Sequence, residues 1–274
     1  MNICDFFQVV ETEEKTHRWT LACHNVKYPL EELARVLAIK IMEHRMRPHH
    51  FKVWESRLNG GDPLPEKTKA AILAFTKPAF GAPEETDGIP IDHLEGLVSQ
   101  YLWYFVCKEI SKEPVVKDIP PGFKSTDPGG DALMIHRKED GHLSFRLWEI
   151  KKFVRRKIDA TTTANSTITK AYDQLRENAL EYLARYTSIG QELNPELSDF
   201  FGGLVELWLD ASPEASAGVS INTSAEFIPP NSFHDFGDKF PEFVDPIRLL
   251  GMIAAVEDFA LFSNMVRGYV WKGL

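Results

Sequence analysis

Residues 129–152, "GGDALMIHRKEDGHLSFRLWEIKK", contain two strand-like runs separated by a polar turn, and this stretch decides the fold. The first run covers 131–137 and the second covers 143–151, with "KEDGH" between them. A glycine in a short polar connection between two such runs is typical of a β-hairpin. We therefore predict an antiparallel hairpin at the centre of the chain.

Three charged residues are predicted to converge at the open end of this hairpin. In an antiparallel pair the indices of directly opposed residues have a constant sum. With the turn centred on Asp140 the sum is 280, which places Asp131 opposite Glu149. Lys151 lies two residues beyond Glu149, and the period of two along a strand puts both side chains on one face.

This layout predicts a metal-dependent hydrolytic site. Two directly opposed carboxylates repel each other, and a hard divalent cation such as Mg²⁺ or Mn²⁺ removes that conflict. A neighbouring ammonium group could then contact a nucleophilic water or a scissile phosphate, where negative charge builds up. We expect Asp131, Glu149 and Lys151 to form such a site for phosphodiester hydrolysis.

The string "GGD", followed 18 positions later by "WEIKK", resembles the PD-(D/E)XK nuclease superfamily, which has the restriction-endonuclease-like fold. The resemblance implies a metal-dependent deoxyribonuclease acting on DNA. Members usually add an acidic residue on a helix before the hairpin, and Glu95 in "HLEGLVSQYLW" occupies that place. The implied metal ligands are Glu95, Asp131 and Glu149, together with the backbone carbonyl of Ile150.

RecB-like members of the superfamily carry a glutamine on the helix after the Glu-x-Lys strand. Gln174, in "AYDQLRENALEYL", is the candidate here. The usual Gln-x-x-x-Tyr is not present, because position 178 is Asn. This departure weakens a specific RecB-like assignment and leaves the hairpin site as predicted.

A narrower resemblance covers most of the chain. The N-terminal segment, the "EG" helix, the hairpin and the terminal "VEDFALFSNMVRGYVWKGL" are similar to HamA-type nuclease subunits of Hachiman antiphage defence. Those subunits act with a helicase partner. The resemblance thus implies a role in bacterial defence and a helicase or ATPase that delivers the DNA.

Charge and composition constrain the class of protein. The chain has 274 residues and a formal net charge of −9, whereas free-standing nucleic-acid binders usually carry excess Lys and Arg. The exception is "KKFVRRK", which is either a solvated strand end or a phosphate-binding patch. Besides Lys151, its basic residues are Lys152, Arg155, Arg156 and Lys157.

Three scattered cysteines without metal-binding spacing indicate a reducing compartment, and "MNICDFFQVV" has no export-signal pattern. The longest apolar stretches are too short to cross a bilayer. We expect a cytoplasmic protein without a membrane partner.

The periodicity along the chain predicts a mixed α/β (α+β) fold with a central sheet flanked by helices. We divide it into an N-terminal α/β segment, 1–85, and a nuclease core with a C-terminal helical closure, 86–274, packed as one unit. Residues 77–90 are the candidate linker. The expected helices are 28–46, 65–75, 91–110, 166–187 and 247–271, and the expected strands beyond the hairpin are 202–211 and 219–224.

Structural roles compete with each catalytic one. Asp92 and Glu95 are spaced as a capping box at a helix start. Asp131 could simply enter a turn, and Glu149 with Lys151 could be an exposed charge pair on an edge strand. Two other functions also stay open: a non-catalytic nuclease-like interaction subunit, and a stand-alone restriction-type endonuclease.

Overall fold

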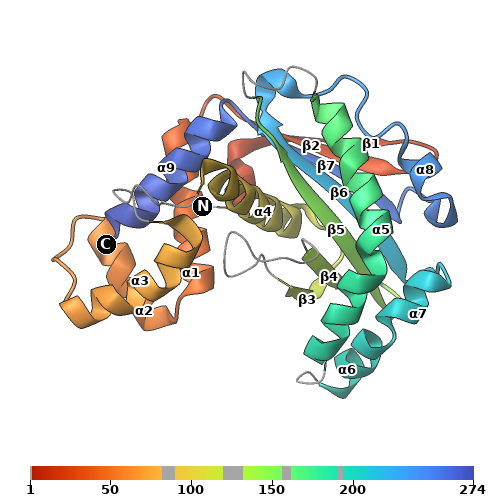
Figure 1. The fold of residues 1–274 in the computed structure, drawn as a ribbon, viewed down its shortest axis with the longest axis horizontal. Helices are drawn as coiled ribbons and strands as arrows, with labels where there is room; N and C mark the ends of the chain where they lie inside the picture. Colours follow the sequence, from red (N-terminus) through yellow and green to blue (C-terminus); the bar gives the residue numbers. More distant parts are fainter. Residues whose placement is uncertain (1, 82–89, 120–131, 156–161, 191–193) are drawn as a thin grey trace.

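The computed structural model describes residues 2–81, 90–119, 132–155, 162–190 and 194–274. Within these residues the chain forms a seven-stranded mixed sheet with helices on both faces (Figure 1). This confirms the predicted α/β class. No helix in these ranges is both long and apolar enough to cross a membrane.

The sheet joins an N-terminal hairpin, a parallel centre and a second antiparallel part. Neighbouring strands are parallel between β2 and β5 and antiparallel at both ends. In spatial order the strands are β1 (Phe7–Glu13), β2 (Arg18–His24), β7 (Leu249–Val256), β6 (Ala215–Ser224), β5 (Leu143–Phe153), β4 (Ala132–Arg137) and β3 (Val115–Ile119).

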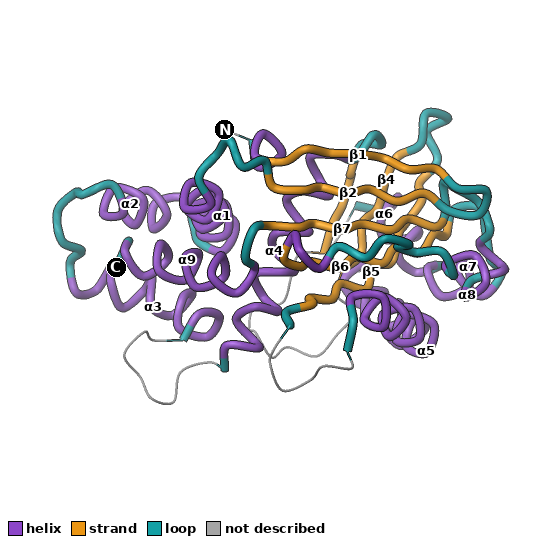
Figure 2. The backbone as a smooth tube through the Cα atoms, turned by 90° about the horizontal axis from the view of Figure 1, so that it is seen from above, coloured by secondary structure: helices purple, strands orange, loops and turns teal. Residues whose placement is uncertain are grey.

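The helices separate into groups on the two faces of the sheet. One face carries α4 (Ile91–Ile110), and beyond it α1 (Leu30–Arg45), α2 (Pro48–Leu58), α3 (Glu66–Phe80) and α9 (Phe259–Lys272) gather at one end of the molecule (Figures 1 and 2). The other face carries α5 (Ala164–Gly190) with α6 (Pro195–Gly202), α7 (Leu204–Leu209) and α8 (Phe236–Lys239). Short 3₁₀ turns η1 (Ile3–Phe6), η2 (Ala225–Phe227) and η3 (Pro241–Phe243) complete the connections.

Alternate residues of β5 belong to different hydrophobic clusters, and this identifies its two faces. Trp148 and Ile150 pack in the cluster that contains α4, whereas Leu147 and Phe153 pack in the cluster that contains α5. The period of two along a strand then assigns every other side chain of β5 to one of these faces. We call them the α4 face and the α5 face.

A glycine of β6 makes room for the indole of Trp148 on the neighbouring strand β5, between the sheet and α4. A Cβ added at Gly218 would lie 2.3 Å from the ring of Trp148, so only glycine fits beneath that indole. Trp148 in turn packs against Trp103 of α4, with ring centroids 5.2 Å apart. The residues of β6 two positions to either side, Ser216 and Ser220, are also small and buried.

The hairpin and the long helices are found where the sequence predicts them. The described residues 132–137 of the first predicted run form β4, residues 143–151 belong to β5, and 219–224 is part of β6. The expected helices 28–46, 91–110 and 166–187 correspond to α1, α4 and α5, while 65–75 is the first part of a longer α3.

Two predicted elements are wrong. Residues 202–211 form the end of α6 and the short helix α7 rather than a strand, because Leu204 is buried while Glu206 and Leu209 face outward at helical spacing. Residues 249–256 form β7 rather than the start of a helix. This run is apolar throughout and buried on both faces, so its hydrophobicity carries no period that would separate strand from helix.

Two local assignments around α4 also need correction. Helix α4 has Pro90 as N-cap, so Asp92 lies within its first turn and the predicted capping box does not form. The candidate linker 77–90 begins inside α3, which continues through Pro78 to Phe80. Residues 82–89 lie outside the described part of the chain.

Candidate functional site

The register of the β4–β5 hairpin agrees with the predicted index sum of 280. Ala132 is opposite Trp148, and the pairing continues in step to Arg137 opposite Leu143. Asp131 lies outside the described residues.

Glu149 and Lys151 form an ion pair on the α5 face of β5. The Lys151 Nζ lies 2.5 Å from the Glu149 Oε1, and only 2% of the Glu149 side chain and 27% of the Lys151 side chain are exposed. The sequence prediction that these two side chains share a face is confirmed. A charge pair this deeply buried requires good geometry, because desolvation of both ions opposes it.

Lys152 forms a second charge cluster on the α4 face. Its Nζ donates to Asp92 Oδ1 at 2.6 Å and to Glu95 Oε2 at 2.9 Å. The Glu95 side chain is only 2% exposed, whereas that of Asp92 is 62% exposed. Both acids lie in the first turns of α4, where the helix dipole favours negative charge. Lys152 therefore fastens the end of β5 to the start of α4.

A polar link beneath this cluster joins three elements. Ser99 of α4 donates from its Oγ to the backbone oxygen of Lys151 at 3.4 Å and accepts from Asn222 Nδ2 of β6 at 2.7 Å. Ser99 and Asn222 are both buried. Sequence reasoning missed both. The available signals were a serine one turn after Glu95 and an asparagine within the apolar run of β6.

The other predicted site residues that the structure describes are Ile150, Gln174 and Arg155, and their side chains do not meet at one site. Ile150 is 5% exposed and packs in the cluster that contains α4. Gln174 is exposed on α5, and its backbone oxygen accepts a hydrogen bond from Asn178 Nδ2 at 2.9 Å. The structure thus leaves the Gln174 side chain on the outer surface of α5. Arg155 is exposed just after β5.

Of the predicted basic patch, Lys152 is not a surface group. Its side chain is 16% exposed and is held by two carboxylates, so Lys152 is neither part of a solvated strand end nor a phosphate contact in this structure. Arg156 and Lys157 lie outside the described residues.

The structure does not bring Glu95 and Glu149 together. Glu95 meets β5 at Lys152, on the α4 face, whereas Glu149 points to the α5 face. Among the residues that the structure describes, which leave out Asp131, no group of three His, Cys, Asp or Glu side chains is arranged to hold a metal ion. Of the predicted catalytic residues, the structure brings Glu149 and Lys151 together.

No protein-family model and no curated protein matches this chain.

Proposed function

We propose that the chain is a metal-dependent nuclease that hydrolyses DNA phosphodiester bonds at the end of β5. One observation carries the proposal: Glu149, a buried acid, stands 2.5 Å from Lys151 in a hairpin whose described register has the index sum of 280 expected from the sequence. The order α4, β4–β5 hairpin, α5, β6 also agrees with the helix, hairpin, helix and strand expected from the sequence. The restriction-endonuclease-like core and the membership of the PD-(D/E)XK superfamily belong to this proposal.

The donor set at this position suits a hard divalent cation. Carboxylate and carbonyl oxygens are the ligands that Mg²⁺ and Mn²⁺ accept, and Asp131, Glu149 and the Ile150 carbonyl would supply them. A bound cation would provide an activated water and polarise the phosphate. Glu95 is assigned a positioning role instead, since its described contact is with Lys152.

In the proposed reaction Lys151 is the side chain that acts on the attacking water and on the phosphate. In the present state its ammonium group neutralises Glu149. In the proposed reaction it would turn to the phosphate, orient the attacking water and stabilise the negative charge that develops on the phosphoryl oxygens. The hydrogen bond from Ser99 to the backbone oxygen of Lys151 holds the backbone from which the Lys151 side chain extends.

The test is cleavage of plasmid, linear duplex and single-stranded DNA with Mg²⁺, with Mn²⁺ or with EDTA. We expect Glu149→Gln and Lys151→Ala each to lower the rate by at least about a hundredfold, the scale of removing one electrostatic group from a transition state. Calorimetry of Mn²⁺ binding should show weaker binding in Glu149→Gln. Cleavage at the normal rate in Lys151→Ala would refute the assigned mechanism.

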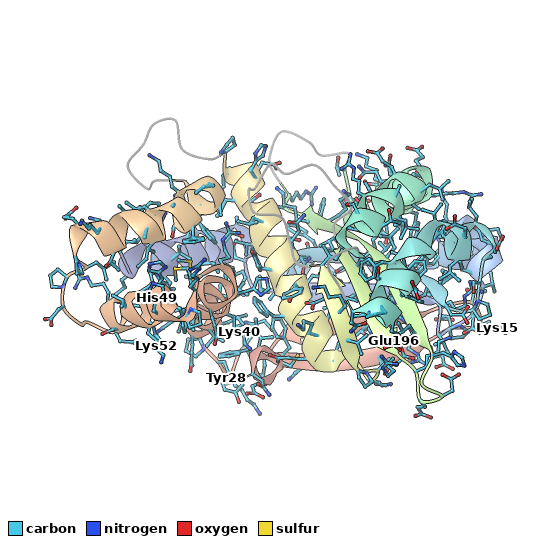
Figure 3. All side chains as sticks on the ribbon, turned by 90° about the horizontal axis from the view of Figure 1, so that it is seen from below. Lys15, Tyr28, Lys40, His49, Lys52 and Glu196 are labelled. Carbon is cyan, nitrogen blue, oxygen red and sulfur yellow. The ribbon has the colours of Figure 1, made fainter. Side chains whose placement is uncertain are left out.

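Matched control variants come from the turn end of the same hairpin. Glu196 of α6, labelled in Figure 3, pairs with Arg137 at 2.8 Å, and Lys138 donates to the Pro213 oxygen at 3.0 Å. All three side chains are on the surface, far along the hairpin from Glu149. Glu196→Gln and Lys138→Ala should therefore leave cleavage unchanged.

A non-catalytic subunit is the second candidate, because a specific observation favours it. Both lysines at the end of β5 are already paired with carboxylates, Lys151 with Glu149 and Lys152 with Glu95. Such balanced pairs also suit a nuclease-like scaffold that only binds a partner. Absence of cleavage of all three substrates, alone and with a co-encoded helicase, would favour the scaffold.

We further propose that a helicase or ATPase presents the DNA to this chain in an antiphage defence complex within the cytoplasm. The support is the net charge of −9 and the resemblance to HamA-type subunits. Stimulation of cleavage by the partner, measured on linear duplex DNA, tests this separately from the chemistry. Full activity with dimerisation in gel filtration would instead indicate a stand-alone restriction-type enzyme.

A further inference from the structure

A cavity of about 450 Å³ lies on the α4 face, beside the first half of β5. Its floor comes from β1, β2, β5 and β7, and its rim comes from the C-terminal end of α4 and the residues that follow. Pockets of roughly 300–1,000 Å³ are the size that holds small organic ligands. The apolar part of the lining includes Ile110, Trp148, Leu250 and Met252.

Arg146 of β5 lines this cavity with an incompletely satisfied guanidinium group. The residue is only 9% exposed and donates a hydrogen bond from Nη2 to the Ile247 oxygen at 3.2 Å. In the part of the chain that the structure describes, its buried Nε has no acceptor. A guanidinium has five N–H donors, and a buried donor without an acceptor costs free energy.

Trp148, two residues further along β5, lines the same cavity and carries a second unsatisfied donor. Its side chain is 2% exposed, and its buried Nε1 finds no acceptor among the described residues. The Arg146 guanidinium carbon lies 6.0 Å from the indole ring. The two donors thus belong to neighbouring side chains on one face of β5.

The ion pairs around the cavity do not include Arg146. Arg18 pairs with Glu11 at 3.0 Å and Lys112 pairs with Glu11 at 2.6 Å, so these lining groups are already compensated. Within the described part of the chain Arg146 forms no ion pair, and Glu113, the other acid of the lining, acts on it only through its charge. Glu13 also pairs with Arg18 at 2.8 Å, so three acids accompany the three cations Arg18, Lys112 and Arg146, and what distinguishes Arg146 is the lack of a direct contact to any of them.

Burial lowers the pKa of the Arg146 guanidinium, with Cys107 and Glu113 acting weakly in the other direction. An isolated buried cation is expensive, and an apolar residue of similar length would avoid that expense. Arg146 is therefore better explained by something that it binds than by its contribution to folding.

We propose that this cavity is a binding site for a small organic anion, with a carboxylate or phosphate head and an apolar body. The head would accept hydrogen bonds from Arg146, whose fork of donors matches either group in a bidentate manner. The body would lie against Trp148 and Met252. Arg146 lies three residues before Glu149, about 10 Å at 3.3 Å per residue, and alternation places it on the α4 face whereas Glu149 lies on the α5 face, so the site is distinct from the proposed nuclease centre.

The experiment is calorimetric titration of the full chain with three probes that share one apolar body: phenylacetate, phenyl phosphate and phenylacetamide. We expect one of the anions to bind with a stoichiometry of one, and the neutral amide to bind at least about tenfold more weakly, as the loss of one charged hydrogen-bonding group implies. The tighter anion identifies the head group. Absence of saturable binding by both anions up to about 10 mM, or equal binding of the amide, overturns the proposal.

Variants locate the binding to this cavity. Arg146→Met removes the guanidinium at similar length and should weaken anion binding by at least about tenfold. Arg137→Met, on the neighbouring strand and paired with Glu196 at the surface, is the matched control and should bind normally. Thr20→Phe keeps Arg146 and fills the cavity from β2, so it should also abolish binding.

Unchanged binding in Arg146→Met overturns the proposal. If Arg146→Met does not fold, Thr20→Phe decides, and binding at the normal affinity in that variant places the ligand elsewhere and also overturns it. None of these measurements uses DNA cleavage. The outcome is thus independent of whether the chain is a nuclease.

Discussion

The close contact between Gly218 of β6 and Trp148 of β5 makes a quantitative prediction about stability. In Gly218→Ala the new methyl group would lie 2.3 Å, 2.4 Å and 2.6 Å from three ring atoms of Trp148. Carbon atoms in contact are ordinarily about 3.5–4.0 Å apart, so the overlap exceeds about 1 Å. The indole cannot simply withdraw, because Trp103 lies against it.

The expected cost follows from this overlap. Overpacking of a buried site costs typically about 1–3 kcal/mol, while replacing glycine by alanine stabilises by about 0.4–1 kcal/mol through the unfolded chain. The net expectation is a loss of about 2 kcal/mol in the free energy of unfolding. For a chain of this size that corresponds to a melting temperature lower by about 4–8 °C.

Gly96 provides the matched control for the same substitution. It lies in α4, where an added Cβ would meet no atom within 4 Å. Gly96→Ala should therefore stabilise the protein by about 0.5–1 kcal/mol, the difference in helix propensity. Urea unfolding of both variants should give changes of opposite sign, separated by about 3 kcal/mol.

A second substitution identifies the atoms responsible. In a Trp148→Val background the ring is gone, and Gly218→Ala should lose most of its cost, which a double-mutant cycle measures. If Gly218→Ala proves as harmless as Gly96→Ala, the packing of β6 against the indole is not as described. An equal cost in both backgrounds would likewise refute the steric explanation.

Two further predictions concern pH. Burial, with a smaller effect of nearby Arg146, lowers the pKa of His136 to about 3, so the unfolded chain binds a proton first and stability falls as the pH drops below 6.5. Between pH 7.5 and pH 5 the free energy of unfolding, measured with urea, should fall by about 2 kcal/mol. His136→Gln should remove this fall, whereas His142→Gln, at the exposed turn, should leave it unchanged. Burial alone would raise the pKa of Glu109, but two backbone N–H groups of η1 and the Lys40 ammonium, labelled in Figure 3, hold it below its ordinary 4.5. The carboxylate of Glu109 stabilises the folded state above pH 4.5, and this stabilisation is lost as the pH falls through the folded-state pKa. Glu109→Gln should therefore lower the free energy of unfolding by about 2 kcal/mol at neutral pH and by much less near pH 3. A cost that does not depend on pH would contradict this explanation.

The polar turn between two strand-like runs predicted the hairpin, and helical periodicity predicted the long helices. The hairpin register and the pairing of Glu149 with Lys151 follow from alternation along one strand, and α4 and α5 follow from helical spacing. Strand β7 was mistaken for helix because both of its faces are buried, which removes the alternation from its sequence.

Periodicity could not predict which helices pack on which face of the sheet. Spacing places Lys151 and Lys152 on opposite faces of β5, yet it does not say which helix lies over each face. That choice decides the partner of Glu95, which is Lys152 rather than the acid and lysine of the predicted metal site. It also decides that Gln174 points away from the sheet.

The pairing of β2 with β7 sets a lower limit on when this protein can fold during its synthesis. Arg18 lies opposite Leu250, so 232 residues of chain separate the two partners. At about 5–20 residues per second a ribosome needs on the order of 10–50 s to make that interval. Throughout that time the N-terminal hairpin exposes an unpaired strand edge, which other chains could pair with. We expect early-emerging chains to depend on chaperones, and the sheet to close only after almost all of the protein has been made.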